Sequence, residues 1–211
     1  MIVYLDTSAL VKLYIDEAGA PMVRRAARGA ELMATSEIAY VEMRAALARR
    51  HREGDLSARG HRRVLESLYA DWAEMFVLSL GGALIKDAGN VAERYRLRAY
   101  DAIHLASALL LRERIDAVPV FACWDDDLSA AAARAGLQLL PTVASASLGV
   151  QAEVSPRRQG RSAVLGRLCD NLFGDFNGRI PDRLKLRDIP QADSGPVWAV
   201  VRPPFCPDIA A

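Results

Sequence analysis

The sequence predicts an α/β fold, in which a parallel-stranded sheet is flanked by helices on both faces and is followed by an irregular C-terminal extension. Two observations carry this prediction. Short apolar runs of four to six residues alternate along the chain with helical patterns, which is the arrangement typical of parallel sheets. Near residue 148 the alternation stops, and seven of the ten prolines but none of the six tyrosines come after that point.

The first half of the chain contributes two predicted strands and four predicted helices. The run 2–5 reads IVYL, stops at Asp6, and is followed at once by a helical pattern at 8–15. A second helical pattern, at 20–28, leads to the apolar run at 31–35. Longer helical patterns at 36–52 and 57–73 follow, and the first of them contains SEIAYVEMRAALARR.

The second half contributes three more strands, at 75–80, 118–123 and 137–140, and three helices, at 83–96, 101–114 and 127–135. Strands that are separated by helices pair in parallel, so residues 1–148 are expected to form one domain with ligands at the carboxyl edge of its sheet. In 149–211 prolines and glycines interrupt every pattern. We therefore expect that stretch to be a poorly ordered extension.

Composition limits the classes of protein to consider. The chain has 211 residues, of which 52% are hydrophobic, and its formal net charge of +1 does not mark it as a nucleic-acid binder. Its three cysteines have no paired spacing, which argues against a disulfide framework or a zinc site and favours a reducing cytosol. The N-terminus lacks a signal-peptide pattern, and no apolar run is long enough to cross a membrane. We expect a cytoplasmic protein without membrane contact.

Four carboxylates occur where a ligand site is expected. Asp6 follows the first strand, Asp101 opens the helix DAIHLASALL, and Asp125 follows the strand PVFACW. Glu42 lies within a helix, and its place in the helical repeat puts it beside the apolar stripe. Each aspartate also has a simpler explanation as a helix N-cap, and Glu42 as an exposed or ion-paired residue. Spacing alone therefore leaves their convergence open.

If the four carboxylates converge, they require a cation, because several negative charges in one pocket repel each other. Oxygen ligands without cysteine or clustered histidine favour Mg²⁺ or Mn²⁺ over zinc. Such a cation lowers the pKa of a bound water and neutralises charge on a phosphodiester. A convergent site would therefore suit a metal-dependent nuclease.

Four segments, each holding one of these acids, resemble a known family. They are MIVYLDTSALVKLY, SEIAYVEMRAAL, RAYDAIHLASALLL and VFACWDDDLSAAAARAGLQLLP, and together they span residues 1 to about 141. The chain resembles the PIN-domain ribonucleases, in particular the VapC-type toxins of bacterial and archaeal toxin–antitoxin pairs. The resemblance implies catalytic and metal-ligating roles for Asp6, Glu42 and Asp101. It implies Asp125 as the fourth acid, although Asp127 could replace or assist it.

The resemblance also implies partners: an RNA substrate, a cognate VapB-type antitoxin, and a second copy of the chain in a homodimer. The stretch 43–63 adds seven arginines against two acids. A charge run of this kind is either a solvated helical face or a contact for the RNA backbone. We favour RNA contact through Arg44, Arg49 and Arg52.

Several polar residues near the acids have two interpretations. Thr7 and Ser8 either cap the following helix or donate hydrogen bonds to a phosphate or a bound water, and we favour capping. His104 either acts as a general base or packs and bonds to backbone, and we favour packing. Cys123 stands where relatives usually carry threonine or serine, so one hydroxyl contact is expected to be missing.

The leading prediction is a magnesium-dependent ribonuclease toxin that hydrolyses RNA with a metal-activated water. Haloacid-dehalogenase-type phosphatases also place an aspartate after the first strand, but they need a second aspartate where this chain has Ser8. The other alternative is a catalytically inactive PIN scaffold that binds RNA or a protein partner. A missing acid would indicate such a scaffold, whereas this sequence has all four.

Overall fold

A computed structural model describes residues 1–115 and 117–141, and these residues form the predicted α/β fold. Five parallel strands make one sheet in the order β3-β2-β1-β4-β5. The strands are β1 (Ile2–Leu5), β2 (Leu32–Ser36), β3 (Phe76–Leu78), β4 (Val120–Ala122) and β5 (Gln138–Leu140). The helices are α1 (Thr7–Tyr14), α2 (Ala20–Gly29), α3 (Ile38–Arg52), α4 (Ala58–Trp72), α5 (Gly82–Tyr95), α6 (Ala99–Arg114) and α7 (Asp126–Arg134).

The predicted elements are all present among the described residues, with small shifts at their ends. The largest consequence is for α6, which begins at Ala99, so Asp101 lies in its first turn instead of opening it. The expected extension, 149–211, lies outside the described residues.

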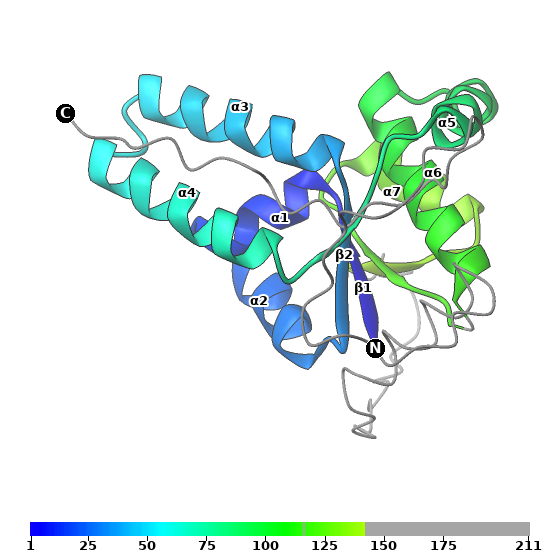
Figure 1. The fold of residues 1–211 in the computed structure, drawn as a ribbon, viewed down its shortest axis with the longest axis horizontal. Coiled ribbons are helices and arrows are strands. Elements are labelled where there is room, and N and C mark those ends of the chain that lie inside the picture. The colour runs from blue at the N-terminus through cyan, green and yellow to red at the C-terminus, as the bar shows by residue number, and fades with distance from the viewer. Residues whose placement is uncertain (116, 142–211) are drawn as a thin grey trace, which may run out of the picture.

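The central strand β1 is buried on both faces. Tyr4 packs toward α6 and α7 in one apolar cluster, while Val3 and Leu5 pack toward helices α1 to α4 in another. Figure 1 shows these two groups of helices on opposite sides of the strands. Burial on both faces explains why β1 is a continuous apolar run instead of an alternating one.

Helices α3 and α4 lie side by side and extend away from the sheet (Figure 1). Their contacts with the core come from the α3 residues Ala39, Met43 and Leu47, and from Val64, Leu68 and Trp72 of α4. None of the helices in the described part of the chain combines the length and apolar character needed to span a membrane.

The loop between α1 and α2 fixes the segment that follows β4. Gly19 has φ +89°, and a Cβ there would lie 2.6 Å from the indole of Trp124, so this close approach requires glycine. Lys12 lies 5.1 Å from the centre of the same ring. Trp124 is thereby held beside the carboxyl ends of β1 and β4, where Asp6 and Asp125 emerge.

Candidate active site

Asp6 lies at the carboxyl end of β1 and caps α1. Its Oδ1 accepts a 2.8 Å hydrogen bond from the backbone N–H of Ala9. The Ser8 hydroxyl lies 2.8 and 2.9 Å from its two oxygens, and the Cys123 thiol donates to Oδ2 at 3.3 Å. The capping interpretation of Asp6 is therefore correct, but only one of its oxygens serves the cap.

Burial dominates the electrostatics of Asp6, which is only 4% exposed. Burial raises the pKa of its carboxyl, although His104 and the hydrogen bonds from Ala9, Ser8 and Cys123 act in the opposite direction. A nearby cation would favour the ionised form of this carboxyl. Asp6 therefore has the environment of a carboxylate that benefits from a positive partner.

Cys123 stands where a hydroxyl contact was expected to be missing, and its thiol donates a hydrogen bond to Asp6 in place of a hydroxyl. Burial, with the nearby charge of Asp6, raises the pKa of its thiol, so the sulfur keeps its proton and donates to Asp6. The same sulfur accepts a 3.3 Å hydrogen bond from the backbone N–H of Asp125. Cys123 thus links the carboxylate of Asp6 to the backbone of Asp125.

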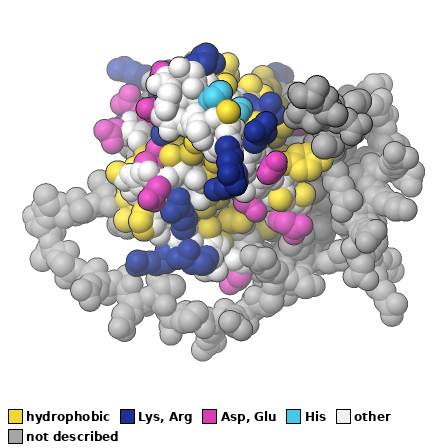
Figure 2. Space-filling model, turned by 90° about the vertical axis from the view of Figure 1, so that its left-hand side faces the viewer, with side chains coloured by type: hydrophobic (Ala, Val, Ile, Leu, Met, Phe, Trp, Pro, Cys, Tyr) yellow, Lys and Arg dark blue, Asp and Glu magenta, His cyan; other side chains and the backbone are white. Residues whose placement is uncertain are grey.

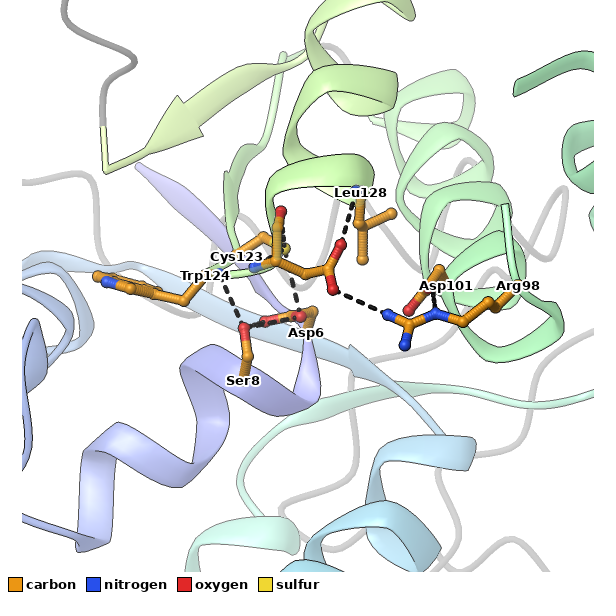
Figure 3. A network of polar contacts seen from close by, with 8 residues as sticks. Asp6, Ser8, Arg98, Asp101, Cys123, Trp124 and Leu128 are labelled. Atoms are coloured by element: carbon orange, nitrogen blue, oxygen red, sulfur yellow. Dashed lines mark hydrogen bonds and ion pairs between the residues drawn. The ribbon is translucent and has the colours of Figure 1, made fainter. Parts of the chain in front are cut away.

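Asp125 caps α7 with one oxygen and faces a cation with the other. Its Oδ1 accepts from the Leu128 N–H at 2.9 Å, and its Oδ2 accepts from Arg98 Nη2 at 2.8 Å. Arg98 Nε donates to Asp101 Oδ2 at 2.7 Å, so one guanidinium bridges Asp101 and Asp125 (Figure 3). The two carboxylates raise the pKa of Arg98, through the hydrogen bond and charge of Asp101 first. Asp126 and Asp127 are exposed in the first turn of α7.

Glu42 reaches the site from α3 and joins a separate set of hydrogen bonds. Its Oε2 accepts from Thr7 Oγ1 at 2.5 Å and lies 2.9 Å from His104 Nε2. Nδ1 of His104 lies 3.1 Å from the Tyr4 hydroxyl. A carboxylate only accepts, so Nε2 carries the proton toward Glu42 and Nδ1 accepts from Tyr4.

The environment of Glu42 favours its ionised form. Burial acts to raise its pKa, but the hydrogen bonds from His104 and Thr7, with the electrostatic effects of His104 and Arg98, outweigh it. The pKa of Glu42 therefore lies below its usual value. In this respect Glu42 differs from Asp6, although Glu42 bonds to Thr7, the residue that directly follows Asp6.

The interpretations of the polar residues near the acids are partly correct. Thr7 and Ser8 do not cap α1, because Asp6 does so; they bond to Glu42 and Asp6 instead. His104 is buried, as a packing residue should be, at 2% exposure. Its partners are side chains, namely Tyr4, Thr7 and Glu42, and not the expected backbone groups.

The four acids are the type of ligand that binds a divalent cation, but their side chains do not form a preformed metal site. No three His, Cys, Asp or Glu side chains of the described residues lie close enough together to hold a metal. Asp101 and Asp125 already share a cation, the guanidinium of Arg98, which shows that one positive charge can serve both. All the oxygens concerned are carboxylate oxygens, which suit Mg²⁺ or Mn²⁺.

The basic residues predicted to contact RNA lie on the exposed side of α3. Arg44 lies over the ring of Tyr40 and donates to its hydroxyl at 3.2 Å, and Arg49 lies 4.0 Å from Glu53. Arg52 is exposed. Figure 2, which faces this end of the molecule, shows Lys and Arg side chains interspersed with Asp and Glu. This surface is therefore locally basic, but it carries negative as well as positive charges.

Arg50, from the same basic stretch, has a structural role. It lies 2.5 Å from Glu17, which also pairs with Lys12 at 2.5 Å. Lys12 is almost fully buried, so Glu17 compensates a charge that would otherwise be costly to bury.

Arg98 and Tyr4 were not singled out by sequence reasoning as site residues. One local signal was available for Arg98, because it precedes Asp101 by three residues, a spacing at which charges meet on a helix. No such signal existed for Tyr4, which meets His104 a hundred residues later.

Comparison with known proteins gives consistent results. The family model described as PIN domain matches residues 3–135. Ribonuclease VapC49 of Mycobacterium tuberculosis (strain H37Rv) is 36% identical over 148 residues, which cover 66% of this chain and 95% of that protein. Ribonuclease VapC46 of the same strain is 34% identical over 106 residues, covering 50% of this chain and 73% of its own.

Among solved structures, a toxin–antitoxin complex from Klebsiella pneumoniae aligns with a TM-score of 0.45 at 19% identity. The alignment covers 60% of this chain and 90% of that one.

Proposed function

This chain belongs to the PIN-domain family, and from that premise we propose that it is a magnesium-dependent ribonuclease and the toxin of a VapBC-type toxin–antitoxin pair. The observation that carries the proposal is the placing of the acids. Asp6 and Asp125 follow neighbouring strands at the carboxyl edge of the sheet, and Asp101 shares a cation with Asp125. This edge is where parallel α/β sheets bind their ligands.

In the proposed reaction, Asp6, Glu42, Asp101 and Asp125 would hold Mg²⁺, or Mn²⁺ in its place. When bound, the cation supplies a bound water of lowered pKa and neutralises charge on the phosphodiester. The protein orients these ligands: Ala9 and Ser8 fix Asp6, while Thr7 and His104 fix Glu42. His104 is a positioning residue in this scheme, since its ring is buried and bonded to Glu42.

RNA is the proposed substrate because the curated relatives are ribonucleases by name. Arg44, Arg49 and Arg52 are the proposed contacts for its backbone, since they project from the same helix that carries Glu42. We also propose a VapB-type antitoxin as partner, a homodimer as the assembly, and the cytoplasm as the location. The names of the relatives support the antitoxin proposal.

One observation favours the alternative of an inactive PIN scaffold. Arg98 neutralises Asp101 and Asp125, and a permanently bound guanidinium would keep a metal away from both. A scaffold of this kind would bind RNA or a protein partner without cleaving it.

The decisive experiment is RNA cleavage by the purified parent, Asp6→Asn and Asp87→Asn. Asparagine caps a helix about as well as aspartate, so Asp6→Asn should fold, yet its cleavage should fall at least about 100-fold. Asp87→Asn is the matched control, because it removes the same charge at an exposed position of α5. Both the parent and the control should need Mg²⁺ or Mn²⁺ and lose activity in EDTA.

Two further readouts separate the alternatives. Mg²⁺ should raise the melting temperature of the parent more than that of Asp6→Asn, because a ligand stabilises only the state that binds it. RNA binding without cleavage by the parent would favour the inactive scaffold. Cleavage that survives EDTA, or that Asp6→Asn retains in full, would refute the metal-dependent mechanism.

A further inference from the structure

Arg98 is the side chain that stands between two of the proposed metal ligands. It is the residue before α6, and its guanidinium reaches Asp101, one turn along that helix, and Asp125, at the start of α7. Nε lies 2.7 Å from Asp101 Oδ2, and Nη2 lies 2.8 Å from Asp125 Oδ2 (Figure 3). The two carboxylates therefore face one another across a protein cation.

The oxygen that Asp125 could offer to a metal is the one that Arg98 occupies. Oδ1 of Asp125 is committed to the N–H of Leu128 as the cap of α7, which leaves Oδ2 as the oxygen directed into the site. A divalent cation at Oδ2 would lie within a few ångströms of the guanidinium, where like charges repel strongly. Metal and Arg98 therefore compete for Oδ2 of Asp125 in this arrangement.

Little holds Arg98 in place apart from these two contacts. Its side chain is 75% exposed, and exposed ion pairs contribute little to stability because water screens them. A guanidinium released from the carboxylates remains attached at the edge of the site. Its planar set of donors suits bidentate binding of a phosphate.

We propose that Arg98 is an exchangeable counter-ion: it neutralises Asp101 and Asp125 in the metal-free protein, is displaced when a divalent cation binds, and then contacts an RNA phosphate. The inference rests on the proposed function, because it takes both aspartates as metal ligands. It also explains why no three potential metal ligands among the described residues lie close enough together to hold a metal. Asp101 and Asp125 are arranged around a guanidinium, which is larger than the ion that replaces it.

The test is calorimetric titration of Mg²⁺ and Mn²⁺ into the full-length chain without RNA, comparing the parent with Arg98→Gln, Arg98→Lys and Arg25→Gln. Without the competitor, Arg98→Gln should bind metal about three- to tenfold more tightly, the range that displacing two exposed ion pairs allows. Arg98→Lys should fall between this variant and the parent, because an ammonium lacks the fork that bridges two carboxylates. Arg25→Gln removes an exposed charge from α2 and should match the parent.

Two other readouts follow the arginine itself. The Nε–H NMR signal of Arg98, assigned by its loss in Arg98→Lys, should shift when metal is added to the parent. At saturating metal, Arg98→Gln should raise the KM for RNA several-fold, because the released guanidinium no longer pairs with a phosphate. An unchanged KM would overturn the phosphate contact.

The outcomes for metal affinity distinguish this inference from the proposed function. If the parent binds metal and Arg98→Gln binds it equally or more weakly, Arg98 is not a competitor and the inference fails alone. If neither protein binds metal, both proposals fail. Tighter binding by Arg98→Gln with a parent-like Arg25→Gln supports both.

Discussion

Tyr4→Phe tests whether the buried hydrogen bond behind Glu42 stabilises the fold. Tyr4 is fully buried in the central strand, stacks on Phe121 with ring centres 5.4 Å apart, and has its hydroxyl 3.1 Å from His104 Nδ1. Burial raises the pKa of Tyr4 well above its usual value, so the hydroxyl keeps its proton and donates. The substitution removes that one oxygen and leaves the stacked ring in place.

The expected loss of stability is about 1–2 kcal/mol. A neutral buried hydrogen bond contributes about 0.5–1.5 kcal/mol, and a buried acceptor left without its donor costs about 1–3 kcal/mol. The lower part of that range applies here, because phenylalanine fills the same ring volume and creates only a small void. His104 Nδ1 is the acceptor that would be left unpaired, since the ring as a whole is only 2% exposed.

The assay is urea unfolding at pH 7 with Tyr40→Phe as the matched control. The Tyr40 hydroxyl accepts from Arg44 at the surface, so the same change there should alter the free energy of unfolding by less than about 0.5 kcal/mol. The denaturant dependence should stay the same in both variants, because neither changes the surface exposed on unfolding. If Tyr4→Phe unfolds at the same urea concentration as the parent, the Tyr4–His104 bond contributes nothing to stability.

Three further predictions concern other parts of the chain. Arg49→Glu combined with Arg52→Glu should weaken RNA binding and make it less dependent on salt. The slope of log binding constant against log salt concentration should fall by roughly 0.7 for each lost phosphate contact. If the double variant binds RNA as well as the parent at every salt concentration, this part of α3 is only a solvated face. Glu17→Gln should destabilise the fold by about 1–2 kcal/mol at pH 7, because the buried ammonium of Lys12 then has no negative charge beside it. Burial acts to raise the pKa of Glu17, but hydrogen bonds from its two cations hold it lower, so parent and variant should converge in stability as the pH falls below about 4.5. A chain ending at residue 148 should remain folded and cleave RNA, because all five strands of the described sheet precede that point; insolubility of the shortened chain would contradict the proposed domain boundary.

The sequence alone determined the architecture. Strand β1 reads as an apolar run because both of its faces are covered, and α3 and α4 read as helices because their apolar residues repeat at helical spacing. The two caps were also predictable, since Asp6 and Asp125 each stand at the junction between a strand and a helix. These features depend on neighbours within about four residues, which is the range over which sequence patterns carry information.

The tertiary structure decided what each carboxylate faces. Arg98 reaches Asp125 across 27 residues of chain, Cys123 meets Asp6 across 117, and His104 meets Glu42 across 62. These contacts exist because β1 and β4 are neighbours in the sheet while α6 packs over them, and no local pattern encodes that adjacency. Burial follows from the same packing, and it separates Asp6, whose pKa rises, from Glu42, whose hydrogen bonds keep its pKa low. Sequence could therefore name the acids, but only the assembled core sets the charge and the partner of each one.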